Sequence, residues 1–474
     1  MTKLRIPDLA RDPASRPKRA WHFGLVGLAA MTMAACGQSE QVHEPKTTMG
    51  TDRFGNRVEI PNPSRQDRLQ ATIPGYSTPD GSHTECFGRQ IFDTPSKSTF
   101  YWAIPSKASD GTFESLSQRF NDGTGRGNIE VETKELLTQF AVYGPITEEL
   151  RQSFFSYRAD NNEALLRNLG RSLKVLQERE ERFRPNPPGP NTMANLGAEI
   201  AATKKSIADL KADQYRKLID LGRANSLAFR AELNAAEPYM HGAVVLREHI
   251  VAFQSMLRGI ENYAEPTENQ WQVAENALRQ LISQLQPRDL YEIPKDRGFC
   301  LPYAFLRDDG TYGNKISTSF RFADSPAVIY TLSVASIPGG GASETTILNA
   351  TGRSATGILS QLPENTTVKQ RLGPRPAKIG ALSSEQGGIV VEAKRPGQPP
   401  REGYHVYTGY AGWAGSQILP TIEVTMESAA RAAYPKLTMD APPYEQARPR
   451  LDALLKSIRL RPTTPPMPEL VGIQ

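Results

Sequence analysis

The sequence predicts an α+β fold of two domains, in which antiparallel sheets pack with helices and a long helical hairpin is inserted in the N-terminal domain. Three observations support this prediction. The chain has 474 residues, and chains longer than about 250 to 300 residues usually divide into domains. Short runs rich in β-branched and aromatic residues occur in both halves of the chain. Between these runs, apolar residues recur with a helical period of about 3.6 residues.

Strands are expected where short apolar runs are bounded by proline or glycine. In the N-terminal domain, residues 86–93 and 100–104 form such runs, which Pro95 and Pro105 end. They predict a hairpin or two neighbouring strands. The C-terminal domain has further runs of this kind at residues 299–306, 317–322, 327–335, 389–393, 404–410 and 421–426.

Helices are expected where the apolar period lengthens to between three and four residues. This period includes the apolar residues of 136–142 and returns at residues 245–263 and 270–285. Two periodic stretches flank the proline-rich residues 184–190 and predict an antiparallel helical hairpin. The last amphipathic stretch, residues 444–457, predicts a helix packed on the C-terminal sheet.

These signals give an expected division of the chain. The tether is expected because its residues are polar, contain several prolines and lack a sustained period. The segments are a signal peptide at 1–35, a flexible tether at 36–75, an N-terminal domain at 76–292 with the helical insertion at about 161–237, a C-terminal domain at 293–463 and a tail at 464–474.

The N-terminus has the layout of a bacterial lipoprotein signal. Basic residues precede an uncharged apolar run, residues 21–35, which is too short to span a bilayer in mature form. The run ends in Ala34 and Ala35 before Cys36, the pattern of a lipobox, and Gly37 at the second mature position favours release to the outer membrane. We therefore expect a periplasmic protein anchored by a lipid on Cys36. The alternative is an ordinary signal peptide with a chance cysteine.

The charge of the chain does not indicate a nucleic-acid partner. The calculated pI is about 8.9, from 56 basic and 51 acidic side chains. Residues 1–35 hold six of the basic and two of the acidic residues, so the remaining chain has 50 and 49, a net charge of +1. A nearly neutral chain lacks the electrostatic footprint of nucleic-acid binding.

Cys86 and Cys300 remain as a pair once Cys36 is assigned to lipid. In an oxidising compartment such a pair favours a disulfide. The bond would close a loop of more than two hundred residues, which the chain-entropy model values at about 4 to 5 kcal/mol. The alternative is two unpaired buried thiols in separate domains.

The sequence shows no apparatus of a known enzyme class. It has no nucleophile elbow, phosphate-binding loop, zinc-protease motif or paired C-x-x-C motif. His241 and His249, eight residues apart, could share a helix face but could not chelate one metal directly, and His405 is more simply explained by a structural role. We therefore expect no catalytic residues, no metal and no cofactor.

Aromatic residues provide the candidate partner-binding set. Tyrosine and tryptophan are enriched at protein interfaces, where they bury a large area at a small entropic cost. The alternative is that aromatics alternating along a strand fill the core. The candidates are Trp102, Tyr404, Tyr407, Tyr410 and Trp413.

Several short motifs occur in the order and rough spacing of a known family. They are CFGR at residues 86–89 leading into 91–95, IP at 293–294 with GFCL at 298–301, PTI at 420–422 and SIRLRP at 457–462. Together they resemble the two-domain immunity lipoproteins that protect bacteria from lipase effectors of the type VI secretion system. The helices between about residues 161 and 237 are longer than this family's pattern.

The resemblance implies a periplasmic inhibitor that grips a cognate class-four phospholipase effector between its two domains. Inhibition would block substrate access or the opening of the lipase lid, without any activity of the inhibitor's own. The partners implied are that secreted lipase and, through the N-terminal lipid, the membrane. Two other functions stay open: an envelope structural or assembly lipoprotein that uses its helical hairpin as a contact surface, and an exported hydrolase.

Overall fold

A computed structural model describes residues 47–51, 57–95, 100–108, 116–155, 160–189, 192–211, 216–231, 239–259, 266–336, 365–394, 397, 399–413 and 415–472. The expected signal peptide and Cys36 lie outside these residues. All features below belong to the compact unit Pro45–Gln474. Within the described residues, no helix is both long enough and apolar enough to cross a membrane.

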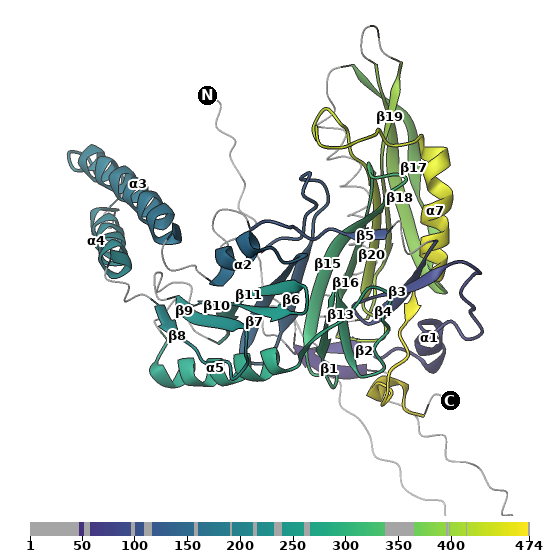
Figure 1. Ribbon diagram of the computed structural model, residues 1–474, viewed down its shortest axis with the longest axis horizontal. Coiled ribbons are helices and arrows are strands. Elements are labelled where there is room, and N and C mark those ends of the chain that lie inside the picture. The colour runs from purple at the N-terminus through teal and green to yellow at the C-terminus, as the bar shows by residue number, and fades with distance from the viewer. Residues whose placement is uncertain are drawn as a thin grey trace, which may run out of the picture. The chain divides into compact units, whose positions relative to one another are not determined.

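One antiparallel sheet of 13 strands dominates this unit (Figure 1). Its strands are β5 (Phe100–Trp102), β6 (Asn128–Glu132), β7 (Leu136–Tyr143), β8 (Arg216–Leu218), β9 (Ser226–Ala231), β10 (Tyr239–Leu246), β11 (His249–Leu257), β15 (Gly313–Phe322), β16 (Val328–Ala335), β17 (Thr366–Ile379), β18 (Leu382–Ala393), β19 (Arg401–Tyr410) and β20 (Thr421–Ser428). Their order is β17-β18-β19-β20-β16-β15-β6-β7-β11-β10-β9-β8, and β5 also pairs with β15. Because β15 pairs with β6, residues 76–292 and 293–463 contribute strands to a single sheet.

The two faces of this sheet differ in their packing. Phe140, Phe320 and Val424 lie on one face and belong to the main hydrophobic core. Helices α5 (Glu268–Ser283) and α7 (Tyr444–Ser457) add their apolar stripes to the same core, as the sequence predicts. Along the central strands, side chains of the opposite face are polar or charged.

Two small sheets of three strands accompany the large one. The first has the order β21 (Arg459–Leu460), β4 (Gln90–Thr94), β3 (His83–Phe87). The second has the order β12 (Leu285–Pro287), β14 (Ala304–Arg307), β13 (Gly298–Leu301). An isolated antiparallel bridge between Gly88 and Cys300 connects them. The N-terminal, middle and C-terminal parts of the chain therefore meet in these small sheets.

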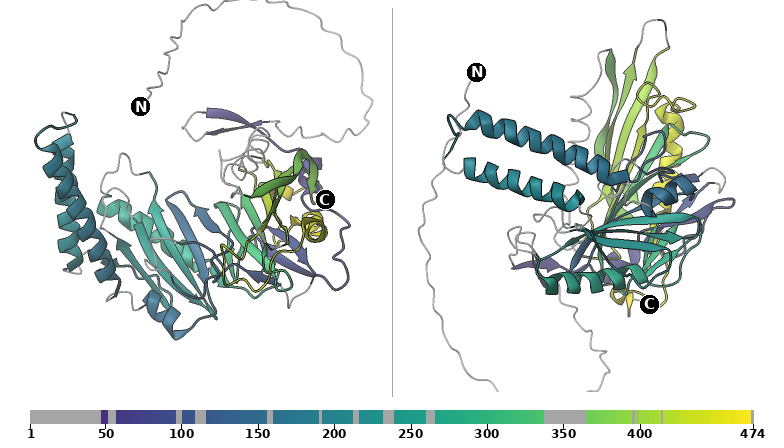
Figure 2. Two further views of the ribbon diagram at one scale, coloured as in Figure 1. Left: turned by 90° about the horizontal axis from the view of Figure 1, so that it is seen from above. Right: turned by 60° about the vertical axis from the view of Figure 1, so that its left-hand side comes forward.

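The helices follow local signals in the sequence. Helix α5 begins with a capping box, in which the Thr267 and Gln270 side chains each bond the other's backbone N–H. Helices α3 (Asp160–Phe183) and α4 (Thr192–Lys211) run antiparallel against each other, where the sequence predicts helices (Figure 2). The proline-rich residues 184–189 separate them because proline cannot continue the helical hydrogen bonds.

The structure corrects the helices predicted at residues 136–142 and 245–263. Residues 136–142 lie in β7, and the described part of the second range, 245–259, holds the end of β10 and all of β11. The parts of these strands that lie nearest α2 are covered on both faces. The main core packs on one side, while Leu150 and Phe154 of α2 (Glu148–Phe155) join a second apolar cluster on the other. A strand buried on both faces loses its polar alternation, so its apolar residues imitate a helical period.

Two further predictions change. Helix α4 ends at Lys211, and β8 and β9 occupy part of the range in which the helical hairpin was expected to reach residue 237. Within the expected tether, the chain forms β1 (Thr47–Thr51), β2 (Arg57–Pro61) and α1 (Arg65–Gln70). Ala71, just after α1, is buried in the main core, and its carbonyl accepts a hydrogen bond of 2.6 Å from the Leu460 N–H. This part of the segment is therefore folded rather than a flexible tether.

Candidate functional site

Three of the motifs that produce the family resemblance, CFGR, GFCL and SIRLRP, meet in one buried region, here called the junction and defined by Cys86, Arg89, Arg288, Cys300 and Arg461. Cys86 on β3 and Cys300 on β13 form a disulfide whose Cα atoms are 5.8 Å apart, across 214 sequence positions. Gly88 and Cys300 exchange two backbone hydrogen bonds of 2.8 Å each. The disulfide and the bridge together fasten the two small sheets to each other.

Arg89, which follows the cysteine in the CFGR motif, forms a buried ion pair across the junction. Its guanidinium donates to the Gly298 carbonyl at 3.2 Å and to the Asp308 carboxylate. Asp308 in turn accepts backbone N–H groups of Gly310, Thr311 and Tyr312 at 3.0 to 3.1 Å. Burial lowers the pKa of Arg89, and the Asp308 carboxylate opposes that shift. Both charges are therefore held in a fixed geometry away from water.

Arg461, in the C-terminal SIRLRP motif, binds backbone carbonyls rather than carboxylates. Its guanidinium donates to Gly298 at 2.7 Å, to Asp296 at 2.9 Å and to Pro294. Its own N–H donates to the Arg89 carbonyl at 2.8 Å. Burial, together with the nearby charges of Arg89 and Arg288, lowers its pKa. Arg461 thereby ties the chain's C-terminal strand to residues 294–298.

Arg288 completes the junction from the other side. It lies 2.6 Å from a buried carboxylate oxygen of Glu85 and donates to the carbonyls of Cys86 at 3.3 Å and Leu301 at 3.0 Å. Its guanidinium is 1% exposed, so these groups replace water as its partners. The motif residues of the junction are thus buried and partnered within the chain, and their role is structural.

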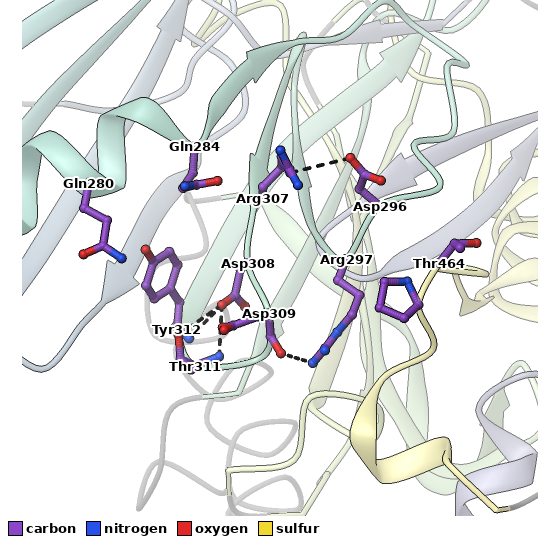
Figure 3. A pocket seen from close by; sticks show the side chains of 11 residues that line it. Gln280, Gln284, Asp296, Arg297, Arg307, Asp308, Asp309, Thr311, Tyr312 and Thr464 are labelled. Atoms are coloured by element: carbon purple, nitrogen blue, oxygen red, sulfur yellow. Dashed lines mark hydrogen bonds and ion pairs between the residues drawn. The ribbon is translucent and has the colours of Figure 1, made fainter. Parts of the chain in front are cut away.

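A pocket of about 320 Å³ lies beside the junction (Figure 3). Helix α5 provides Gln280 on one side, and residues 296–297 and 307–312 provide most of the rest. Arg307 lies 3.5 Å from Asp296, and Arg297 donates to the Asp309 carbonyl. The cations that line this pocket therefore already have partners in the protein, which makes it a poor site for an ionic ligand.

The structure places the predicted partner-binding aromatics in or against the core. Trp102, Tyr404 and Tyr407 are only 2%, 4% and 5% exposed, while Tyr410 and Trp413 are half-buried against the main core. The rings of Trp102 and Tyr404 fill the space between the sheet and the elements packed on it. Tyr407 lies on the opposite face of the sheet, on the same side as His405, and lines a groove there. Partner contact by these five residues stays a prediction.

The surface opposite the main core offers a different candidate, here called the polar face. It spans the central strands from β11 to β19, where polar side chains lie opposite one another in the strand register. Each of its residues is half-buried or exposed. They are Asn128, Glu130, Gln139, Gln254, Lys315, Ser317, Ser333, His405, Glu423 and Glu427.

Apolar clusters lie at both ends of the polar face. At one end, Phe154 of α2 packs with Tyr143 of β7, their ring centroids 4.8 Å apart. At the other end, Phe120 and Leu437 pack with Ile329 of β16. The polar face is therefore the part of this sheet surface that neither cluster covers.

A groove of about 400 Å³ crosses the polar face over β15, β16, β19 and β20. In it, His405 Nδ1 lies 3.6 Å from the Glu427 carboxylate. Burial acts to raise the pKa of Glu427, but the His405 hydrogen bond and the charges of Arg126 and His405 outweigh burial, so the pKa is lowered. Tyr407 also lines the groove, and burial raises the pKa of its phenol, which is neutral at pH 7.

Hydroxyl pairs order the floor of this groove. Ser333 Oγ donates to Ser317 Oγ at 2.7 Å, and Ser319 Oγ and Thr331 Oγ1 are 2.8 Å apart. Both pairs join β15 to β16 across the strand register. The groove therefore presents a fixed set of small hydrogen-bonding groups between charged side chains, an arrangement that suits contact with another protein surface.

The structure gives the histidines packing roles. His241 stacks on Phe229 with ring centroids 5.6 Å apart, and His249 stacks on Tyr303 at 4.0 Å. Burial lowers the pKa of His249. Across the described ranges, no three His, Cys, Asp or Glu side chains gather closely enough to hold a metal ion.

The sequence analysis missed the polar face, although a signal for it exists. Residues 315–322 (KISTSFRF) and 421–427 (TIEVTME) alternate polar and apolar side chains. This alternation is typical of strands with one face in the core and the other facing outward. It identifies the outward-facing residues of each strand, but the order of the strands is needed to assemble them into one surface.

Comparison with known proteins gives a family match for the C-terminal part of the chain. Residues 292–463 match the family model described as Tle cognate immunity protein 4 C-terminal domain. The match confirms the resemblance to immunity proteins that the motifs indicate. No curated protein matches the chain.

Solved structures of immunity proteins are also similar. One chain in the crystal structure of a Tle4–Tli4 complex is 16% identical, with a TM-score of 0.45, and the alignment covers 82% of this chain and 100% of that chain. The apo structure of the immunity protein TplEi of the T6SS from Pseudomonas aeruginosa is 16% identical, with a TM-score of 0.42, and the alignment covers 81% of this chain and 98% of that chain.

Proposed function

We propose that this chain is a type VI secretion immunity protein, which binds a cognate phospholipase effector and inhibits it. The observation that carries this proposal is the match of residues 292–463 to the Tle cognate immunity protein 4 C-terminal domain. Inhibition requires binding alone, so the chain makes and breaks no covalent bond itself.

The proposal includes a periplasmic location and a lipid on Cys36. The signal-like residues 1–35 and the small residues before Cys36 support it. A lipid anchor would hold the inhibitor beside the membrane that a phospholipase attacks, which raises its effective concentration there. Anchoring and inhibition would thus act together.

The polar face is the surface that we assign to the effector. It is formed by both predicted domains, because β6 and β7 come from one and β15, β16, β19 and β20 from the other. Lys315 is exposed, and Glu130 and Glu423 are half-exposed, so solvent reaches their charges. This surface can therefore form charged contacts with a partner. A lipase docked here would contact both halves of the chain at once.

The test is binding and inhibition of the lipase encoded beside this chain's gene. The two proteins are co-expressed, pulled down and assayed for phospholipid hydrolysis, and survival of cells that receive the lipase in the periplasm is scored with and without this chain. Binding with loss of hydrolysis is expected. An unbound, fully active lipase would overturn the proposal.

Replacing Cys36 with Ser should move the chain to the soluble fraction and weaken protection. Unchanged membrane retention would overturn the anchor.

A charge swap tests the surface separately. Lys315→Glu with Glu423→Lys keeps the net charge but reverses two groups of the polar face, and should weaken lipase binding at least about tenfold, or about 1.4 kcal/mol. The matched control is Lys174→Glu with Glu178→Lys, which reverses an exposed pair on α3. Equal affinity of both variants for the lipase would remove the polar face from the interface and leave the function standing.

A further inference from the structure

A groove between β17 and α7, here called the basic groove, carries an excess of positive charge. Its volume is about 510 Å³. Four of its side chains are cationic and one, Asp452, is anionic. The lining residues are Arg375, Pro376, Ala377, Lys378, Gly380, Gln386, Arg448, Asp452, Leu455 and Lys456. Such an excess is local, because the chain without residues 1–35 is nearly neutral.

A bulge in β17 positions Arg375. The register with β18 shifts between Leu372 and Arg375, where Gly373 adopts a positive φ of 78° that glycine tolerates best. Arg375 then lies opposite Gln386, and its guanidinium donates to the Gln386 side-chain oxygen, from Nε at 3.2 Å and also from Nη2. The bulge therefore positions the Arg375 guanidinium against Gln386 at the edge of the sheet.

The partner of Arg375 is neutral, so the cation keeps its charge for another ligand. Gln386 is 4% exposed and donates its own amide to Thr408 Oγ1 at 3.0 Å, which fixes it in place. A buried amide held in this way orients the guanidinium without neutralising it. An arginine oriented by neutral groups is prepared to bind an oxyanion.

The remaining cations come from both walls of the groove. Lys378 on β17 and Lys456 on α7 are exposed, and among the described residues neither forms an ion pair with a carboxylate. Arg448 does, with Asp452 at 3.4 Å and Glu445 at 3.9 Å on its own helix. Gly380 lies between the walls, where its N–H donates to the Leu455 carbonyl at 2.7 Å. Three of the four cations are thus uncompensated and face one space from two elements.

Protection of the sheet edge explains only part of this arrangement. Strand β17 is the edge strand, and its lysines, arginines and prolines discourage pairing with another sheet. That role does not require Lys456 on α7, nor the fixing of Arg375 by a buried amide. The groove therefore needs an explanation as a binding site.

We propose that the basic groove binds a phosphate group, either of an anionic phospholipid headgroup or free in solution. Phosphate has several oxygens that can be bound at once by an arginine on β17 and a lysine on α7, and the volume exceeds what one protein carboxylate would fill. The inference deepens the proposed function, because a headgroup in this groove adds a second membrane contact to a lipid-anchored inhibitor and would hold its folded part at the membrane surface.

Vesicle co-sedimentation tests the proposal, with unlipidated residues 37–474 purified and their fold checked by circular dichroism. Vesicles contain phosphatidylcholine alone or mixed with phosphatidylglycerol. Binding to the mixed vesicles only, reduced by salt and by inorganic phosphate, is expected. The variant Arg375→Gln with Lys378→Gln should reduce that binding about tenfold or more. Lys204→Gln with Lys205→Gln on α4 is the control with the same change of charge, and it should bind as the unaltered chain does.

Each other outcome is decisive. Titration with inorganic phosphate but no vesicle binding identifies free phosphate as the ligand. Binding to neither phosphate nor vesicles, or equal losses in the groove and control variants, overturns the site. A third outcome is a groove variant that still binds phosphate and vesicles but binds the lipase more weakly. That result would assign the groove to an acidic segment of the lipase and would overturn the phosphate site. Lipase inhibition measured without membranes reports on the proposed function alone, so the two can fail separately.

Discussion

The junction and the polar face are both rich in charged groups, but they differ in where those groups find partners. At the junction, Arg89, Arg288 and Arg461 are 1% to 2% exposed and donate to carboxylates and carbonyls of the same chain. On the polar face, Lys315 is exposed and Glu423 is half-exposed, so water satisfies much of their charge. The first region is closed to a partner because its guanidinium groups are buried, whereas the second is accessible.

This difference separates the residues that identify the fold from those available for binding. Three of the motifs that produce the family resemblance, CFGR, GFCL and SIRLRP, lie in the junction. None of the residues that define the polar face belongs to these motifs. Under the proposed function, the effector would therefore contact residues other than those that produce the resemblance.

The largest expected effect is on the junction. Arg89→Met removes the cation beside Asp308 and leaves a fully buried carboxylate unpaired, which should lower the free energy of unfolding by about 3 to 5 kcal/mol. Urea unfolding measures it. The matched control is Arg307→Met, which breaks an ion pair whose side chains are about half exposed and should cost less than about 1 kcal/mol. Equal losses in both variants would show that the buried pair has no special role.

A smaller loss is expected when the covalent part of the junction is removed. Cys86→Ala with Cys300→Ala frees a loop of 214 residues. This should lower the free energy of unfolding by about 2 to 4 kcal/mol, the usual range for disulfides, which lies below the chain-entropy value of about 4 to 5 kcal/mol. The urea midpoint of this double variant is compared with the midpoints of the unaltered chain in the presence and in the absence of a reductant. The reduced chain and the double variant should agree. Two free thiols at these positions in the denatured, unreduced chain would contradict the bond.

Local signals were enough to predict the elements that form without distant partners. The Thr267 capping box and the apolar stripe of Trp271, Leu278 and Leu281 mark α5, while Pro443 precedes the stripe that marks α7. Each signal lies within a few residues of the element it defines. Most strands of the C-terminal half were predicted for the same reason, because consecutive residues alternate between core and surface. Strand β17 was not predicted, and the run at 299–306 is divided between β13 and β14.

Distant pairing could not be predicted in this way. Strand β7 is central in the sheet and pairs with β6 on one side and β11 on the other. Its residues Phe140 and Val142 belong to the main core, and Ala141 and Tyr143 belong to the second apolar cluster on the opposite face. Its apolar run fits a helix as well as a strand until these partners are known. The merging of two predicted domains into one sheet likewise rests on the pairing of β15 with β6, for which the sequence has no local sign.

The candidate site shows the same division. The aromatic segment of β19 was recognised, but alternation alone cannot tell which of two adjacent residues lies in the core. Tyr404 packs on Tyr444 of α7, whereas His405 lies on the polar face opposite Glu427. The side on which α7 packs makes that choice, and α7 is separated from β19 by more than thirty residues. The sequence alone could therefore not show which residues of β19 lie on the polar face.

The smallest expected effect is a pH dependence on the polar face. Because the pKa of Glu427 is lowered in the folded state, its contribution to stability is present above its ordinary pKa of 4.5 and is lost as the pH falls through the lowered value. The unfolded chain takes up the proton first, so stability falls with decreasing pH. With the carboxylate 32% exposed, the contribution should stay below about 1 kcal/mol. Urea unfolding between pH 7 and pH 3 should show a gap between the unaltered chain and Glu427→Gln that closes below pH 4.5. His405→Gln removes the hydrogen-bond partner of Glu427. In that background, Glu427→Gln should change the free energy of unfolding less at pH 7 than it does in the unaltered chain. A difference between the unaltered chain and Glu427→Gln that does not depend on pH would contradict the role of the pair.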